Sequence, residues 1–436
     1  MEKTRDIGEL IDSARLTRLQ ITVLAVCYFL NMLDGMDVLA IAFAAPSIST
    51  DWAISPQSLG VVFSAALIGM TTGAAFLSPF SDKIGRRNVI LLSLVLISAG
   101  MVATALANSV PQLIVLRFIA GLGIGSMLAS MTSLVSEYAP DRHRNLFILI
   151  LQAGYPIGAI ITGFIAAAIL PEHGWRPLFV IAGVVSLLGI PLVMLLLPES
   201  LTFLAKKQPR NALQKINSTL KKMAVAPLDA LPTLTEKQAL KVSLRSLLHS
   251  DYRAATLSLW GAFFMSFATL YFLLSWVVKL AIESGLPLES AIYAGVSLNL
   301  GGFAGGIFLG AISNRVGLTR IIAIFAVIGS LFSVVYGTVD ASVSTMLLLV
   351  FLLMFFVQGS FTGLFAVAVR IYPTEIRTTG IGWAIGAGRT GAILGPIVAG
   401  VLLGAGLSIS WTFVVFAGPM LLAALFALKI RLGSTG

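Results

Sequence analysis

Residues 57–80, QSLGVVFSAALIGMTTGAAFLSPF, and residues 88–107, NVILLSLVLISAGMVATALA, are two apolar runs separated by the charged segment SDKIGRR at 81–87. Each run has about the length of a helix that crosses a bilayer, which needs roughly 20 residues. The segment between them is short, and three of its four charged residues are basic. This stretch therefore predicts two membrane-spanning helices joined by a polar turn.

The same pattern of apolar runs and short polar breaks extends along nearly the whole chain of 436 residues. Of these residues 57% are hydrophobic and 11% are charged, whereas about 25% are charged in an ordinary soluble domain. The alternating ten-residue segments of an outer-membrane barrel are absent from the sequence. We therefore predict an all-α integral membrane protein with twelve transmembrane helices. Their expected positions are 19–45, 57–80, 88–107, 112–137, 144–170, 177–197, 254–281, 288–312, 320–338, 344–369, 379–403 and 408–430.

The net charge of +10 is distributed unevenly along the chain. If the N-terminus lies inside the cell, nearly all of the 29 Lys and Arg residues fall in segments on the cytoplasmic side. Arg176 and Lys279 fall in outer loops, and Arg117 and Arg389 fall inside expected helices. This asymmetry is the positive-inside pattern. It predicts a multi-pass protein of the cell (inner) membrane with both termini cytoplasmic, and it makes the lipid bilayer, not nucleic acid, the expected partner.

Several features that would mark other kinds of protein are missing from the sequence. The first 18 residues carry both signs of charge and lack a small-residue cleavage site, so no removable signal peptide is expected. Cys27 is the only cysteine, and the three histidines lie in separate expected loops, which excludes a disulfide framework and a metal site. There is no Walker A sequence for ATP. We expect neither a cofactor nor an enzymatic activity.

A long polar segment at 198–253 divides the expected helices into two groups of six. The groups form a weak internal repeat, in which FSDKIGRRNVI at 80–90 matches ISNRVGLTRII at 312–322. We therefore expect two pseudo-symmetric six-helix bundles. The expected organisation is a cytoplasmic N-terminus at 1–18, bundles at 19–197 and 254–430, a cytoplasmic linker at 198–253 and a cytoplasmic C-terminus at 431–436.

Three short motifs resemble the major facilitator superfamily of secondary transporters. SPFSDKIGRR at 78–87 is similar to its signature Gly-x-Leu-Ala-Asp-Arg-x-Gly-Arg-Lys, with Ser78 and Phe80 in place of the usual Gly and Leu. RFIAGLG at 117–123 matches its fourth-helix pattern Arg-x-x-x-Gly-x-Gly, and PESLTFL at 198–204 is similar to the end of its sixth helix. The resemblance implies the major facilitator fold and transport by alternating access.

Within that superfamily, the first helix resembles that of the aromatic acid:proton symporters. Asp34, Gly35 and Asp37 match their Asp-Gly-x-Asp sequence residue by residue. The resemblance implies uptake of benzoate-like or hydroxybenzoate-like anions together with protons.

Tyr28, Asn31, Asp34 and Asp37 are spaced by three residues and trace one slanting stripe on the first expected helix. A charged side chain at the centre of a membrane helix costs roughly 2.5–3.5 kcal/mol even on the mildest insertion scale. The two carboxylates are therefore expected either to bind protons and substrate or to neutralise buried arginines and hold helices together. We assign all four residues to the substrate site, and the two aspartates also to proton coupling.

Arg117 and Arg389 are the basic residues inside expected helices. Arg117 lies at nearly the same depth as Asp37, so it is expected either to take part in proton coupling or to tether two helices. Arg389 lies near the midplane, about 15 Å deep, where its planar guanidinium is suited to grip a substrate carboxylate. The alternative for Arg389 is an ion pair with Asp34 or Asp37 across the two halves.

Further substrate contacts are expected from aromatic and amide side chains. Helix seven carries an aromatic run that includes Phe264 and Tyr271, whose rings would either stack on an aromatic substrate or pack against neighbouring helices. Asn299 and Gln358 are expected polar contacts in helices eight and ten.

Charged residues at the cytoplasmic ends of several helices are expected to form a gate. Ion pairs between the halves would latch one orientation and break in the other. The alternative is that some of these charges only set topology. The expected gate residues are Asp82, Gly85, Arg86, Arg87, Glu137, Arg144, Glu375 and Arg377.

These features together predict a proton-coupled symporter that imports a small organic anion, an aromatic carboxylate such as benzoate or hydroxybenzoate. Its expected partners are that anion, protons and the bilayer, and it is expected to act as a monomer. A drug:proton antiporter of the same fold is an alternative, although its usual sequence Gly-x-x-x-Gly-Pro-x-x-Gly-Gly is only loosely approximated in helix five. A sugar or aliphatic acid symporter is a third interpretation.

Overall fold

The computed structural model describes residues 16–231, 247–372 and 374–430. Within these residues the regular secondary structure is helical, and twelve helices are long and apolar enough to cross a membrane. The predicted all-α fold with twelve spans is therefore confirmed. The spanning helices are α2 (Arg18–Trp52), α3 (Pro56–Thr72, continued by η1 Gly73–Leu77, η2 Ser78–Phe80 and α4 Ser81–Ile84), α5 (Arg86–Ala105), α6 (Val110–Tyr138), α7 (Asp141–His173), α8 (Arg176–Leu196), α12 (Ser250–Glu283), α13 (Leu288–Val316), α14 (Leu318–Thr338), α15 (Val343–Ile371), α16 (Thr374–Gly404) and α17 (Ile409–Lys429).

The first helix is longer than the sequence predicted. It was expected to end at residue 45, before Pro46, but α2 continues to Trp52. Proline removes one backbone hydrogen bond, yet Pro46 is buried against neighbouring helices, a setting in which membrane helices tolerate proline. The residue after the helix, Ala53, has a left-handed backbone with a φ of 47°.

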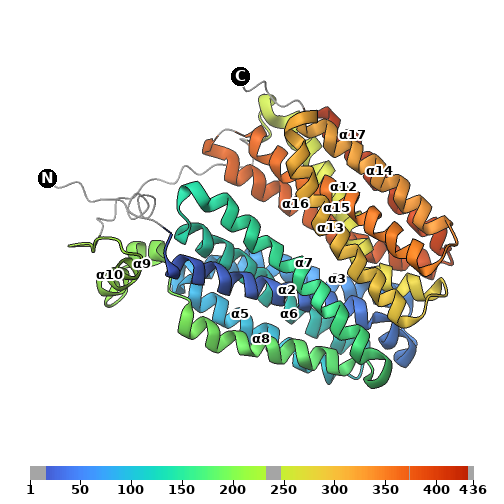
Figure 1. Cartoon of the computed structure of the whole chain (residues 1–436), viewed down its shortest axis with the longest axis horizontal. Helices are drawn as coiled ribbons and strands as arrows, with labels where there is room; N and C mark the ends of the chain where they lie inside the picture. The colour runs from blue at the N-terminus through green and yellow to red at the C-terminus, as the bar shows by residue number, and fades with distance from the viewer. Residues whose placement is uncertain (1–15, 232–246, 373, 431–436) are drawn as a thin grey trace.

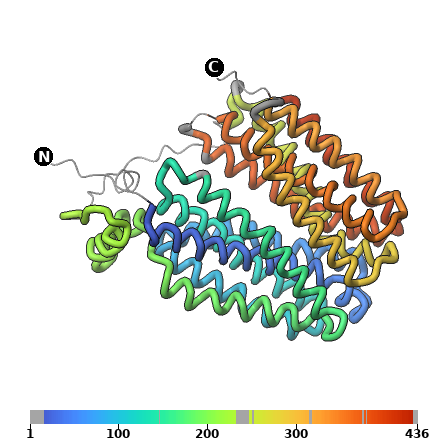
Figure 2. Tube along the Cα trace, in the orientation of Figure 1, coloured from blue at the N-terminus to red at the C-terminus, as the bar shows by residue number. Residues whose placement is uncertain are grey.

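The helices form two bundles that lie side by side (Figure 1 and Figure 2). In the first bundle, α2–α8 (blue to green), α2 packs on α7 and α8 while α6 packs on α3 and α5. In the second bundle, α12–α17 (yellow to red), α12 packs on α16 and α17 while α15 packs on α13 and α14. Two short helices of the connecting segment, α9 (Leu201–Lys207) and α10 (Ala212–Lys222), lie beyond one end of the first bundle (Figure 1).

Among the described residues, the main contacts between the two bundles lie toward one end of the molecule. We call the end that carries α9, α10 and both ends of the described chain the linker end, and the opposite end the far end. The bundles meet through α3 with α16, α7 with α13, and α2 with α12. Ser64 Oγ of α3 donates to the carbonyl of Ile393 in α16 at 2.7 Å, and the Phe63 ring lies edge-on to Trp276 of α12 at 5.3 Å. All four residues lie in the far-end halves of their helices.

The face of α16 that packs on α3 is closed near the far end and open near the linker end. A Cβ atom on Gly400 would lie 2.5 Å from the carbonyl oxygen of Pro56 in α3. Gly386 and Gly382 share that face by helical spacing, but both are exposed. A Cβ on either would meet no atom of another described helix within 4 Å. The bundles are therefore packed together at the far end and separated along this face at the linker end.

We predict that Gly158→Ala destabilises the protein and that Gly386→Ala does not. A Cβ at residue 158 of α7 would overlap the carbonyl oxygen of Met32 in α2, so the two helices must separate, and overpacking of this kind costs about 1–3 kcal/mol. A Cβ at residue 386 meets open space, where alanine is the better helix former by up to about 1 kcal/mol. Thermal unfolding of the purified variants in detergent measures both effects. Equal melting temperatures would contradict the close packing of α2 on α7.

Candidate functional site

Three polar side chains in the middle of α2 are buried in the interior of the protein. They are Asn31, Asp34 and Asp37, and each aspartate is 1% exposed; Tyr28, the fourth member of the predicted stripe, is half-buried. Close packing of α2 on α7 encloses them. A Cβ on Gly35 would overlap the backbone carbonyl of Tyr155 in α7. Asn31 Nδ2 donates to the carbonyl of Leu151 in the same helix at 2.7 Å. The stripe is thus surrounded by protein instead of lipid.

Asp37 lies in a polar cluster made by helices of the first bundle. Ser186 of α8 donates to Asp37 Oδ2 at 3.3 Å. The buried Arg117 of α6 interacts electrostatically with Asp37, but the two do not form a direct ion pair among the described residues. The guanidinium instead donates to Thr104 Oγ1 of α5 at 2.8 Å and lies over the Phe179 ring of α8, 5.1 Å from its centroid. Arg117 therefore connects three helices and places a positive charge near Asp37.

Asp34 belongs to a second cluster, which joins the two bundles. Arg389 of α16 interacts electrostatically with Asp34, and Tyr155 of α7 and Tyr271 of α12 interact with both. Within the described ranges, Asp34 Oδ1, the Tyr155 hydroxyl and Arg389 Nη1 are buried and have no hydrogen-bond partner. Buried polar groups are ordinarily hydrogen-bonded. We therefore take this cluster, which we call the central site, as the candidate binding site.

Tyr155 is the residue of the central site that the sequence did not predict. A tyrosine in an apolar helix is usually a packing residue or an interfacial anchor. The available signal was its setting, GYPIG at 154–158, because glycines allow another backbone to approach closely.

Helix α12 supplies an aromatic surface beside Arg389. Gly391 of α16 packs on the backbone of Phe264. The rings of Phe267 and Tyr271 stack at 6.0 Å with an interplanar angle of 20°. The predicted residues Phe264 and Tyr271 are both half-buried.

The two predicted amide contacts lie on other helices. Asn299 is buried and donates to the carbonyl of Gly295 in its own helix, α13, at 2.9 Å. Gln358 of α15 is half-buried beside Gly302 of α13. Both remain predictions for the substrate site.

No group of three His, Cys, Asp or Glu side chains in the described part of the chain is placed to hold a metal ion.

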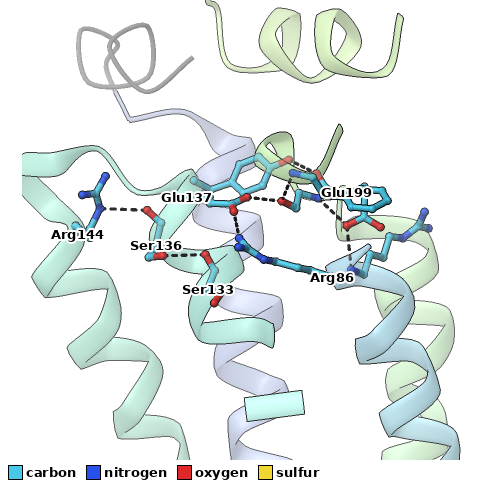
Figure 3. Close-up of polar contacts among 10 residues, drawn as sticks. Arg86, Ser133, Ser136, Glu137, Arg144 and Glu199 are labelled. Atoms are coloured by element: carbon cyan, nitrogen blue, oxygen red, sulfur yellow. Dashed lines mark hydrogen bonds and ion pairs between the residues drawn. The ribbon is translucent and has the colours of Figure 1, made fainter. Parts of the chain in front are cut away.

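A charged cluster lies at the linker end of the first bundle (Figure 3). Arg86, at the start of α5, forms an ion pair with Glu137, at the end of α6, and Ser200 Oγ donates to Glu137 Oε2 at 2.6 Å. Glu199 Oε1 accepts from the backbone N–H of Arg87 at 3.1 Å and of Ser200 at 2.8 Å. These contacts fasten the segment after α8 to the turn between α4 and α5.

Gly85 allows the backbone conformation of that turn and leaves room for the Glu199 carboxylate. Its φ of 100° lies in the region that favours glycine, and a Cβ there would overlap the carboxylate of Glu199. Glu199 was not among the predicted gate residues, although the motif PESLTFL at 198–204 pointed to its segment.

Other predicted gate residues also contact their own bundle. Asp82 is exposed and interacts electrostatically with Arg86. Arg144 forms an ion pair with Asp141 of its own helix at 2.5 Å, and in the second bundle Arg377 Nε donates to a backbone carbonyl of the α15–α16 connection at 3.2 Å.

The predicted latch between the bundles is therefore not formed in this conformation, as far as the described side chains show. Each described ion pair at the linker end joins two residues of one bundle. The side chain of Glu375 lies outside the described part of the structure. This pattern agrees with the separation of the bundles at that end.

We predict that Glu137→Gln lowers the free energy of unfolding by about 2 kcal/mol. Removing one partner of a fully buried ion pair costs about 3–5 kcal/mol, and the Arg86 and Glu137 side chains are still 16% and 14% exposed. The control is Glu283→Gln, which removes a pair with Lys279 in which the glutamate is 40% exposed and should cost less than about 0.5 kcal/mol. Thermal unfolding compares the two variants, and equal small losses would mean that the Arg86–Glu137 pair contributes little.

Comparison with known proteins agrees with the fold. The model of the Major Facilitator Superfamily matches residues 24–356 and 296–434. Two relatives from Pseudomonas putida are each 34% identical to this chain: the 4-hydroxybenzoate transporter PcaK, over 94% of this chain and 91% of the relative, and the gallate transporter, over 96% and 94%. The partially occluded inward open structure of the xylose transporter XylE from E. coli has a TM-score of 0.75 at 19% identity, over 96% of this chain and 99% of that one. The chain therefore belongs to the major facilitator superfamily and is a membrane transporter, not an enzyme.

Proposed function

We propose that this transporter is a proton-coupled symporter that imports an aromatic carboxylate across the inner membrane. The observation that carries the proposal is the central site, where Arg389 of the second bundle and Asp34 of the first interact electrostatically while each keeps a buried polar atom without a partner in the described chain. The relatives named as 4-hydroxybenzoate and gallate transporters support the same class of substrate.

The substrate carboxylate would bind to Arg389. A planar guanidinium forms two parallel hydrogen bonds to a carboxylate, which a lysine cannot do. The ring would then lie against the aromatic surface of α12, where each offset or edge-on ring contact adds about 0.5–1.5 kcal/mol. A cationic drug would be repelled by the charge of Arg389, which argues against the drug:proton antiporter.

The proton would be carried by the two aspartates of α2. A carboxylate exchanges its proton when its contact with water and with nearby charges changes. Asp37 has Arg117 and Ser186 around it within the first bundle, whereas Asp34 faces the second bundle. Because Asp34 and Asp37 interact electrostatically, an anion bound beside Asp34 is coupled to proton binding at Asp37.

Transport would proceed by rocking of the two bundles about the central site. The far-end contacts between α3 and α16 support a state that is open at the linker end. In the opposite state the far ends would separate and the linker ends would meet, with the gate residues pairing between bundles. We propose that one chain suffices as a monomer, since both bundles contribute to the same site.

The linker end would face the cytoplasm, with both termini on that side. Basic residues accumulate on cytoplasmic segments of membrane proteins. The described part of the connecting segment exposes a run of them at this end: Lys206, Lys207, Arg210, Lys215, Lys221 and Lys222.

We predict that benzoate raises the melting temperature of the purified protein, whereas xylose and benzylamine at the same concentration do not, because only a bound ligand stabilises the folded state. Arg389→Lys should weaken benzoate binding by about 10–100-fold, since it removes one charged hydrogen bond. Arg176→Lys is the control, because Arg176 stacks on Trp175 at the far end, 4.4 Å from its ring centroid. Unchanged affinity in Arg389→Lys would remove this arginine from the site, and stabilisation by xylose alone would contradict the proposed substrate class.

We predict that Asp37→Asn abolishes uptake driven by a pH gradient in proteoliposomes, because an amide cannot bind and release the transported proton. Asp51→Asn is the control, since Asp51 accepts a hydrogen bond from Trp175 at 2.9 Å near the far end and should leave uptake intact. Undiminished gradient-driven uptake by the Asp37 variant would falsify its role in coupling.

A further inference from the structure

One hydroxyl group of the central site has no role in the function proposed above. The Tyr155 hydroxyl is buried and lacks a hydrogen-bond partner in the described chain, while Arg389 is assigned to the carboxylate and the aspartates to the proton. An unsatisfied buried hydroxyl is unfavourable, because it has lost its hydrogen bonds to water without replacing them. A polar group of the bound substrate is a natural partner for it.

Backbone packing fixes the position of Tyr155 against α2. A Cβ on Gly35, which lies between the two aspartates, would overlap the Tyr155 carbonyl oxygen. One turn earlier, the carbonyl of Leu151 accepts from Asn31 Nδ2 at 2.7 Å, and Gly158 packs closely on α2 three residues later. The Tyr155 side chain therefore starts from a backbone that is fixed relative to the aspartates.

The polar groups of the central site divide into two pairs, one from each bundle. Asp34 and Tyr155 belong to the first bundle, and Arg389 and Tyr271 belong to the second. Tyr155 interacts electrostatically with all three of the other residues. Asp34 and Arg389 do not form a direct ion pair, as far as the described contacts show. The Arg389–Tyr271 pair is rich in donors, whereas the Asp34–Tyr155 pair offers both an acceptor and a donor.

A hydroxyl group on an aromatic ring matches the Asp34–Tyr155 pair. Such a hydroxyl is both a donor and an acceptor, so it can donate to the Asp34 carboxylate while it accepts from the Tyr155 hydroxyl. An acid held at Arg389 through its carboxylate would extend its ring toward this pair across the site. We infer that Tyr155 is a specificity-determining residue that binds a ring hydroxyl of the substrate, so that the carrier selects hydroxylated aromatic acids over unsubstituted ones. This inference rests on the proposed function.

The test measures binding of 4-hydroxybenzoate and of benzoate to the purified full-length protein by titration calorimetry. The variants are Tyr155→Phe, which removes only the hydroxyl, and the control Tyr336→Phe. Tyr336 is another buried tyrosine, packed edge-on against Phe413 in the second bundle at 5.0 Å.

In Tyr155→Phe, affinity for 4-hydroxybenzoate should fall about tenfold, as expected for the loss of one hydrogen bond, and affinity for benzoate should stay the same. The ratio of the two affinities should be unchanged in Tyr336→Phe. The melting temperature of ligand-free Tyr155→Phe should equal or exceed that of the wild type, because the deleted hydroxyl has no partner to lose.

Each other outcome overturns the inference. Equal losses for both acids would assign Tyr155 to the carboxylate, and a lower melting temperature with equal losses would assign it a structural role. If the wild type binds both acids and Tyr155→Phe binds each acid as tightly as the wild type does, only the inference fails. If the wild type binds neither acid, the proposed function fails and the inference fails with it.

Discussion

The burial of two carboxylates on one membrane-spanning helix is the constraint on which the rest of this structure depends. On a lipid-facing surface each charge would cost at least about 2.5 kcal/mol, so the polar face of α2 has to be enclosed by protein. Helix α7 covers it through glycine contacts that are too close for any side chain, and α12 of the second bundle contacts α2 as well. The polar stripe is thereby held in the interior of the molecule, where the two bundles come together.

Asp34 and Asp37 lie about one helical turn apart yet have different surroundings. The neighbours of Asp37, Ser186 and Arg117, belong to its own bundle, and such a cluster would keep its geometry in the proposed rocking motion. The charged neighbour of Asp34, Arg389, belongs to the other bundle, so this electrostatic interaction would change in the proposed rocking motion. In the proposed mechanism both aspartates take part in proton binding, Asp34 also lies beside the substrate, and the electrostatic interaction between the two aspartates links these roles.

The linker end shows how the two bundles can part without losing their internal order. Arg86, Glu137 and Ser200 connect α5, α6 and the start of α9 within the first bundle. The face of α16 toward the first bundle carries glycines toward both ends, packed on α3 at Gly400 and open at Gly386. Small residues let two helices approach closely with little side-chain rearrangement, which suits a contact that would form and break in the proposed transport cycle.

The sequence by itself determined the class of the protein, the twelve spans and the presence of acidic and basic groups inside them. Lipid allows a long apolar chain few structures, because every backbone polar group in the membrane must be satisfied within the chain, and so apolar runs are reliable evidence for helices. Helix ends were less certain, as the continuation of α2 through Pro46 illustrates. Only the tertiary structure decided that Tyr155 joins Asp34 and Arg389, and that Glu199 contacts the turn at Gly85. Those contacts join residues more than a hundred positions apart, and they depend on the rotation and close approach of whole helices, which the periodicity of a single helix does not specify.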